Sequence, residues 1–295
     1  MLSLEQLAGL LEQNRTAAAA RVREFSIGGK KFDFNSQPAI MGVVNLSADS
    51  WYRESVCLTV EAAVRRGKVL VAQGAHIIDV GAESTLAHAA RVGNAAQKSR
   101  LIPVIKELRA EKILVSVETY SPAVTRASLE AGANILNLTG TAGSKEIFKL
   151  VADHDAAVIV CYVAGKNVRE VGDFDLGADP IPLLRDFFAR QIELAQKCGV
   201  EKIFLDPGLG FYYRNLQNSA VRVRHQMKIF LNTFRLRELG FPICHALPHA
   251  FEFFGEEVRC AEPFFAVLAA LGKTDLFRTH EVPRIKAVLE TLKSF

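Results

Sequence analysis

The sequence lacks the features of disulfide-stabilised and membrane-spanning proteins. Its five cysteines are widely spaced and form no Cys-x-x-Cys pair, so no disulfide framework is predicted. The odd number of cysteines and the absence of a signal peptide predict free thiols in a reducing cytoplasm. No apolar run approaches the roughly 20 residues that a transmembrane helix needs, so we expect no membrane partner.

The sequence also lacks a large excess of positive or negative charge. The 295 residues carry a formal net charge of +4, and lysine and arginine are scattered along the chain. A nucleic-acid partner is therefore not indicated. The longest basic stretch, residues 222–237, lies on a long helical pattern. We interpret it as a solvated helix face, with a binding patch as the alternative.

Residues 1–38 are predicted to form a capping segment outside the main repeat. Leu2 to Phe25 is rich in alanine, leucine, glutamate and arginine, which predicts an amphipathic helix. Ser26 to Phe34 alternates around Gly28-Gly29, which predicts a β-hairpin with a glycine turn.

From residue 39 to residue 295 the chain repeats a short apolar strand, a polar loop and a helix. The predicted strands are Ala39–Asn45, His76–Gly81, Ile113–Glu118, Ile135–Leu138, Ala157–Tyr162, Ile203–Asp206, Pro242–His245 and Leu276–Arg278. The predicted helices are Val60–Gln73, Ala96–Lys112, Pro122–Ala131, Ser144–His154, Pro182–Cys198, Gln217–Leu239, Pro263–Leu271 and Pro283–Leu292. This alternation predicts an α/β protein with a single (β/α)8 TIM barrel. A doubly wound open sheet is the alternative, but no Gly-x-Gly-x-x-Gly follows the first strand.

Polar residues follow the apolar strands at the point where each strand ends. The stretch Ile203-Phe-Leu-Asp206-Pro-Gly-Leu-Gly-Phe211 shows this most clearly, because an apolar strand stops on a carboxylate at a Pro-Gly turn. The others are Asn45, Thr85, Glu118, Asn137, Arg278 and His280. Because the strand ends of such a barrel share one mouth, we expect a pocket there. For any one residue, closing a turn or capping a helix is the alternative.

These residue types divide into two chemical groups. Glu118, Asn137 and Asp206 offer carboxylates and an amide, which suit a flat heterocycle with several N–H donors. A second group offers donors for phosphate or pyrophosphate: Asn45, Thr85, Arg278 and His280. The sequence therefore predicts a nitrogen-rich ring at one end of the pocket and an anion at the other.

Read as motifs, these stretches resemble dihydropteroate synthase. The motifs are Ile40-Met-Gly-Val-Val-Asn45-Leu-Ser-Ala-Asp49-Ser50, Asp79-Val-Gly-Ala-Glu83-Ser84-Thr85, Val115-Ser-Val-Glu118-Thr119, Ala131-Gly-Ala-Asn-Ile-Leu-Asn137, Leu205-Asp206-Pro-Gly-Leu-Gly-Phe211 and Arg278-Thr-His280-Glu-Val282. They span about residue 39 to the C-terminus. The resemblance implies a homodimeric (β/α)8 transferase of folate biosynthesis, which joins a pterin-methyl pyrophosphate to p-aminobenzoate.

Carried over by position, the resemblance implies a role for each residue. Glu118, Asn137, Asp206 and Phe211 would bind the pterin, with Glu118 standing where the family has aspartate. Asn45, Thr85, Arg278 and His280 would bind the anion, with Mg²⁺ at Asn45. The implied catalytic residues are Asn45, Asp206, Arg278 and His280.

The chain departs from the family pattern after strand seven, where the family binds the second substrate, and in the second loop, where the resemblance implies an arginine that helps to bind the anion. The family's Ser-Arg-Lys after strand seven is Pro248-His249-Ala250, and its Ser-Thr-Arg-Pro is Ser84-Thr85-Leu86-Ala87. A loop arginine, Arg53 or Arg214, is a candidate replacement for the missing cations. Use of p-aminobenzoate is left open, as is a second function: a pterin-binding paralogue without catalysis.

Two local patterns carry less weight. His245 and His249 are four residues apart, as in a helical zinc pair, but Pro248 breaks the helix that such a pair needs. Cys161 ends a strand, yet no neighbouring histidine is identifiable, so we interpret it as a core residue rather than a nucleophile.

Overall fold

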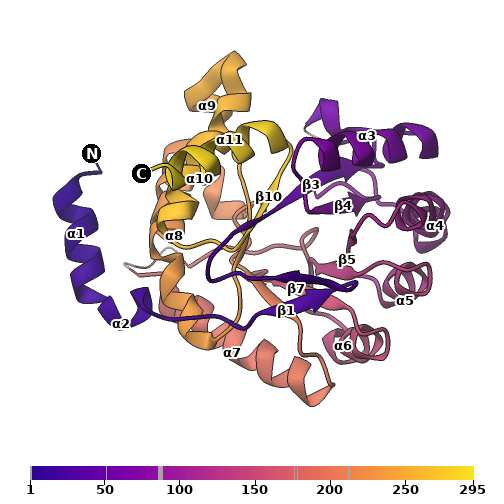
Figure 1. Cartoon of the computed structure of the whole chain (residues 1–295), viewed down its shortest axis with the longest axis horizontal. Coiled ribbons are helices and arrows are strands. Elements are labelled where there is room, and N and C mark those ends of the chain that lie inside the picture. Colours follow the sequence, from indigo (N-terminus) through magenta and orange to yellow (C-terminus); the bar gives the residue numbers. More distant parts are fainter. Residues whose placement is uncertain (1, 51, 86–88, 176, 178, 212) are drawn as a thin grey trace.

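The computed structural model describes residues 2–50, 52–85, 89–175, 177, 179–211 and 213–295, and it shows parallel strands inside a ring of helices (Figure 1). The barrel strands are β3 (Ala39–Asn45), β4 (Ile77–Gly81), β5 (Val115–Thr119), β6 (Ile135–Leu138), β7 (Ala157–Cys161), β8 (Ile203–Asp206), β9 (Cys244–Ala246) and β10 (Leu276–Thr279). The outer helices are α3 (Val60–Ala72), α4 (Asn94–Ala110), α5 (Pro122–Glu130), α6 (Ser144–Asp153), α7 (Ile181–Lys197), α8 (Ser219–Asn232), α10 (Ala261–Leu271) and α11 (Val282–Lys293). None of the helices in the described residues is both long and apolar enough to span a bilayer.

The strands close into a barrel. They pair in the order β8-β7-β6-β5-β4-β3-β10-β9, and every pairing is parallel. A bridge between Leu205 of β8 and Ile243 just before β9 completes the ring, and the Leu205 amide donates to Pro242 O at 3.0 Å. This closure confirms the predicted (β/α)8 barrel and excludes the open sheet.

Alternate residues of each strand face the barrel interior and the helices. On β3, Ile40 and Val44 belong to the core beneath the helices, whereas Met41 belongs to the core inside the barrel. On β4, Ile78 packs outward and Ile77 inward in the same way. Because the period is two, every second residue up to the end of a strand points into the barrel, and this places the last inward side chains at the mouth.

A hairpin closes the opposite end of the barrel. β1 (Phe25–Ile27) pairs with β2 (Lys30–Phe32), as predicted, around Gly28 and Gly29, whose φ angles are +55° and +83°. The rings of Phe25 and Phe34 each lie 5.2 Å, edge to face, from Phe204 of β8. The hairpin therefore fills the barrel floor and leaves the other end for a pocket.

The N-terminal helix is shorter than predicted. α1 (Leu4–Gln13) ends at Asn14, whose side chain bonds back to Leu10 O at 2.9 Å, and α2 (Arg15–Ala18) adds one turn. The chain then turns extended, because the Asn35 side chain pairs with both backbone groups of Val22 at 2.9 and 2.8 Å. The prediction of a helix to Phe25 is wrong for this reason.

The basic stretch 222–237 is a solvated helix face only in part, at the exposed side chains of Arg224 and Lys228 on α8. α8 ends at Asn232 and continues as a 3-10 helix, Thr233–Leu239. Arg222 and Arg237 are buried, and they pair with Glu252 and Asp275 respectively. Arg235 holds Asp179 at 2.7 Å. These ion pairs join α8 and the 3-10 helix that follows it to neighbouring segments, and a charge pattern alone could not reveal them.

The segment between β9 and α10 contains structure that the sequence did not predict. It forms a short helix, α9 (Phe251–Phe254), followed by a 3-10 turn over Gly255–Cys260. In Figure 1, α9 projects beyond the ring of helices. The remaining 3-10 turns are Arg53–Ser55 after β3 and Arg214–Leu216 after β8.

Candidate active site

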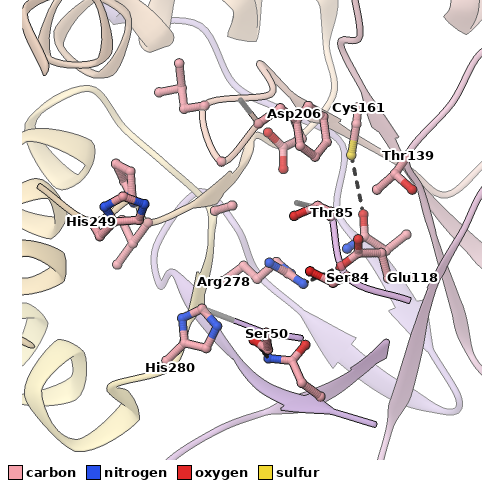
Figure 2. A pocket seen from close by; sticks show the side chains of 18 of the residues that line it. Ser50, Ser84, Thr85, Glu118, Thr139, Cys161, Asp206, His249, Arg278 and His280 are labelled. Carbon is pink, nitrogen blue, oxygen red and sulfur yellow. Dashed lines mark hydrogen bonds and ion pairs between the residues drawn. The ribbon is translucent and has the colours of Figure 1, made fainter. Parts of the chain in front are cut away.

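The carboxyl ends of the strands surround a hollow of about 890 Å³, a volume that includes the solvent space at its opening (Figure 2). The structure brings every predicted site residue to its lining: Asn45, Thr85, Glu118, Asn137, Asp206, Phe211, Arg278 and His280. They come together because parallel pairing carries all strand ends to one side. The roles assigned to them stay predictions.

Arg278 forms the centre of the pocket. Its Nε lies 2.7 Å from Asp79 Oδ2, and its Nη2 lies 2.6 Å from Glu118 Oε2. Asn137 Nδ2 also donates to Asp79 Oδ2, at 3.2 Å. The strand register explains the cluster. Glu118 pairs directly with Asn137, and Ser116, two residues before Glu118 on the same face of β5, pairs with Asp79. One guanidinium therefore serves two carboxylates of the barrel interior.

Asp206 enters the pocket from the turn after β8. Its Oδ1 accepts the Gly208 N–H at 2.8 Å, and its carboxylate is directed into the hollow (Figure 2). Gly208 has a φ of +75°, and a Cβ at this position would lie 2.3 Å from Tyr162 O. Only glycine fits here, so the Asp-Pro-Gly sequence aims the carboxylate and fixes one of its oxygens.

Burial raises the pKa values of two of these carboxyl groups toward neutral pH. Desolvation raises the pKa of Glu118 to about 7, although Arg278 acts against the shift. Desolvation likewise raises the pKa of Asp206 to about 6, opposed by the Gly208 amide and by Arg278. Burial disfavours the charge of Arg278, but Asp79 and Glu118 raise its pKa above the ordinary value. The centre of the pocket is therefore rich in carboxylates, and Arg278 is held there as a charged cation.

His280 and the first loop form one side of the rim. The Tyr52 ring stacks on the His280 ring with centroids 4.6 Å apart, and the Tyr52 hydroxyl donates to Glu281. His280 Nδ1 lies 2.8 Å from Glu262 Oε1. Glu262, on α10, also accepts from the His280 amide and so fixes the ring from behind. These contacts hold the loop after β3 against the loop after β10.

Asn45 connects β3 to the same loop. Its Nδ2 donates to Ser50 Oγ at 2.9 Å and to Ser55 Oγ at 2.6 Å. Both bonds use the amide nitrogen, so the Asn45 oxygen keeps its acceptor capacity. One amide oxygen suits Mg²⁺, which keeps several waters and binds phosphate oxygens of a substrate rather than an all-protein cage. Asn45 would therefore be able to supply one oxygen ligand to such an ion.

Arg169, from the segment after β7, pins the second loop. Its guanidinium donates to Ser84 O at 2.7 Å and to Ala89 O. Glu83 braces the same loop, since it accepts from the Val92 amide at 2.8 Å and from the Tyr120 hydroxyl at 2.7 Å. Thr85 lies in this loop, whereas Leu86 and Ala87 fall outside the described residues.

Arg169→Gln is expected to loosen residues 84, 85 and 89–92, the described part of the second loop. Loss of two charge-assisted hydrogen bonds to backbone carbonyls should speed amide hydrogen exchange in this loop by about tenfold or more. Arg190→Gln is the matched control, because Arg190 is exposed on α7 and does not belong to this loop. Equal exchange rates in the wild type and Arg169→Gln would show that Arg169 does not hold the loop.

The opposite side of the hollow differs from the family pattern. His249 lines it, packed at 4.0 Å against the Phe251 ring, and burial lowers its pKa to about 4, with Arg222 adding to the shift. A neutral imidazole therefore lines the hollow in the segment after β9. Arg222 also lines the hollow, from α8.

The loop arginines proposed as replacements do not serve that role. Arg53 donates to Ala48 O at 2.8 Å, and Arg214 is 72% exposed, 3.6 Å from Asp173. Among the described lining residues, Arg222 is the cation that accompanies Arg278. Sequence analysis missed Arg222 because it judged the residue by its helix pattern.

The local alternatives are resolved by burial. His245 is fully buried and bonds to Thr233 at 2.8 Å. In the part of the chain that the structure describes, no three His, Cys, Asp or Glu residues are grouped to hold a metal ion. The Cys161 thiol donates to Asn137 Oδ1 at 3.4 Å, and burial raises its pKa well above the ordinary value. A thiol with a raised pKa is a poor nucleophile.

Tyr213 does not enter the ring site. It is 1% exposed, and its hydroxyl donates to Tyr162 O at 3.1 Å within an aromatic core cluster. Tyr212 lies outside the described residues. The hollow in front of Asp206 is therefore not filled by Tyr213.

Comparison with known proteins gives a consistent result. Residues 41–245 match the family described as pterin binding enzymes. The chain is 32% identical to dihydropteroate synthase of Synechocystis sp., over 87% of this chain and 89% of that protein. It is 31% identical to dihydropteroate synthase of Streptococcus pyogenes, over 89% of this chain and 97% of that protein.

Solved structures agree. Xanthomonas albilineans dihydropteroate synthase with 4-aminobenzoic acid superposes with a TM-score of 0.78 at 28% identity, covering 92% of this chain and 98% of that one. The same enzyme in complex with 7,8-dihydropteroate gives a TM-score of 0.75 at 26% identity, covering 92% and 98%. The chain belongs to the dihydropteroate synthase family of pterin-binding enzymes.

Proposed function

We propose that the protein is a transferase that joins the methylene carbon of a pterin-methyl pyrophosphate to an amine, as dihydropteroate synthases do. The observation that carries this proposal is the group of Glu118, Asn137 and Asp206 around Arg278 in one buried pocket. It is supported by the relative that is solved with 7,8-dihydropteroate.

The two ends of the pocket take different parts of the substrate. Glu118 and Asp206 accept hydrogen bonds from the ring N–H groups, while the Asn137 amide can donate and accept. Phe211 packs against the flat ring. The pyrophosphate lies toward Asn45, Thr85, Arg278 and His280, and Mg²⁺ held with the Asn45 oxygen would neutralise part of its charge.

The reaction needs no oxidant or reductant. The bond between the pterin methylene and the pyrophosphate oxygen breaks, and its electron pair leaves with pyrophosphate. The lone pair of the amine nitrogen forms the new C–N bond, and the amine gives up one proton to water or to the departing pyrophosphate. The protein's main contribution is to orient the pterin and to place Arg278 and His280 where negative charge develops.

A pyrophosphate-release assay tests this proposal. With pterin-methyl pyrophosphate, Mg²⁺ and p-aminobenzoate, we expect release that requires both organic substrates. Absence of release at enzyme concentrations equal to the substrate would reject synthase activity.

Pterin affinity is expected to rise with pH. Glu118 and Asp206 must be ionised to accept the ring N–H groups, and their pKa values are about 7 and about 6. Deprotonation of these groups therefore accompanies binding. The dissociation constant should be about tenfold larger at pH 6 than at pH 8, and it should stay constant above pH 8. Calorimetry in buffers of different ionisation enthalpy measures both quantities. A dissociation constant that does not change from pH 6 to pH 8 would contradict this assignment.

A pterin-binding protein without synthase activity is the second candidate. The observation that favours it is the neutral His249 at the second-substrate side of the hollow. It predicts calorimetric binding of pterin with no binding of p-aminobenzoate, and tight binding of both would reject it.

We also propose that the protein is a cytoplasmic homodimer. All five cysteines are free thiols, which suits a reducing compartment. Large apolar side chains are exposed on the outer helices, including Phe264 and Leu271 of α10 at 40% and 52%. Light scattering of the purified protein should give twice the mass of 32.4 kDa.

A further inference from the structure

Arg222 is a buried cation on the wall of the pocket. Its side chain is 9% exposed, and its Nη2 lies 2.9 Å from Glu252 Oε2. Glu252 belongs to α9 and remains 46% exposed, so its carboxylate reaches the cation from the solvent side. A guanidinium that is removed from water requires an anion, and the one it has belongs to a short helix at the molecular edge.

The neighbouring side chain leaves a polar atom unsatisfied. Gln226 lies one helical turn after Arg222 on α8, is 3% exposed, and also lines the hollow. Its Nε2 donates to Leu209 O at 2.9 Å, while its buried Oε1 has no hydrogen-bond partner in the described part of the chain. Buried polar atoms are rarely left unpaired without a functional reason. This wall therefore presents a cation to an anionic group of a ligand, and the Gln226 oxygen can accept only from a donor elsewhere on that ligand.

His249 connects this wall to the anion end of the pocket. His249 lines the same hollow as Arg222 and His280. Burial keeps its ring neutral, and the ring presents a flat surface rather than a competing charge. A small ligand that reaches from Arg222 toward the leaving pyrophosphate would pass along His249.

We propose that Arg222 binds the carboxylate of the amine co-substrate and that this carboxylate displaces Glu252. Glu252 then represents, in the free protein, the position of a substrate carboxylate. The inference rests on the proposed function, because the amine must approach a pterin methylene. It makes Arg222 the residue that selects carboxylate-bearing aromatic amines.

A planar guanidinium fits a carboxylate better than other small groups do. It can donate two parallel N–H bonds to the two oxygens, and a charge-assisted pair of this kind is stronger than a neutral hydrogen bond. An uncharged amide of the same shape can accept on one side only. Wild-type protein is therefore expected to bind p-aminobenzoate about 10- to 100-fold more tightly than p-aminobenzamide.

Two substitutions with opposite expected effects test the proposal. Arg222→Gln should abolish the preference for p-aminobenzoate over p-aminobenzamide. Glu252→Gln should tighten p-aminobenzoate severalfold and leave p-aminobenzamide unchanged, because the competing carboxylate is gone. Arg214→Gln is the matched control, since Arg214 is 72% exposed and pairs with Asp173 away from the hollow. Binding is measured by calorimetry with and without saturating pterin and pyrophosphate, after circular dichroism confirms folding.

The outcomes separate this inference from the proposed function. Pterin binding together with the two opposite shifts supports both. Pterin binding with no preference for the carboxylate, or with a preference that survives Arg222→Gln, overturns the role of Arg222 alone. Failure of Arg222→Gln to fold leaves Glu252→Gln decisive, because unchanged or weaker p-aminobenzoate binding in that variant overturns the proposal. Absence of pterin binding overturns the proposed function and this inference together.

Discussion

Arg278→Met is expected to lower the free energy of unfolding by about 3–5 kcal/mol, the largest stability effect that we predict. Asp79 is fully buried, and Glu118 is nearly so, and both rely on the Arg278 guanidinium at 2.7 and 2.6 Å. Removing one partner of a buried ion pair leaves uncompensated charge inside the protein, which costs about this amount. Methionine fills most of the volume, so the loss reports charge rather than a cavity. Urea denaturation at pH 8 measures it.

The control and the rescue use residues with different burial. Arg185→Met breaks a pair with Glu238 in which the two side chains are 42% and 33% exposed, so a loss under about 1 kcal/mol is expected. Adding Asp79→Asn to Arg278→Met should restore part of the stability, because one buried charge disappears. If Arg278→Met is no more destabilising than Arg185→Met, Arg278 does not neutralise the pocket.

Asp206→Asn is expected to weaken pterin binding and to stabilise the free protein. The substitution removes a buried carboxylate acceptor but keeps its shape. We therefore predict about 100-fold weaker pterin binding, and a loss on the order of 10²–10³ in any synthase rate. These losses would make Asp206 the main ring anchor.

The gain in stability follows from the direction of the pKa shift. The Asp206 carboxyl ionises near pH 4 when unfolded but near pH 6 when folded, because burial raises its pKa. Ionisation of Asp206 therefore lowers the free energy of unfolding. This loss of stability begins above about pH 4 and is complete above about pH 6. Asparagine has no such charge, so the variant should be more stable by about 1–3 kcal/mol at pH 8 and show little difference at pH 4.

Asp186→Asn, on the exposed side of α7, is the control and should change neither quantity. Thermal unfolding at pH 4 and pH 8, with calorimetric pterin titration at pH 8, provides the test. A variant that is less stable at pH 8, or that binds pterin as the wild type does, would contradict the role of Asp206.

Local sequence signals predicted the barrel and its mouth. β3, β6 and β8 have the predicted bounds, because short apolar runs that end at polar or Pro-Gly sequences determine a strand locally. The hairpin at Gly28-Gly29 was predicted for the same reason. The site residues could be predicted as a group because strand ends of a parallel barrel must converge.

The contacts that organise the pocket depend on residues far apart in sequence. Asp79 is the one charge within its own apolar strand, β4, and this signal was available, but its partner Arg278 is 199 residues away. Glu262 resembles any helical glutamate, yet it holds His280. The sequence pattern around Arg222 indicates a surface residue, whereas in the fold Arg222 is paired with Glu252 of α9. α9 itself is short and has no helical period to detect. Burial and pairing across the fold decide these roles, and neither is encoded locally.

The most direct test of the whole account is a crystal structure of the protein with a bound pterin. We predict the ring in the mouth of the barrel, with its N–H groups within hydrogen-bond distance of the Asp206 carboxylate and its plane against Phe211. Glu118 and Asn137 should contact the same ring from β5 and β6. A pterin bound elsewhere on the protein, or a ring in the mouth that makes no contact with Asp206, would contradict the account.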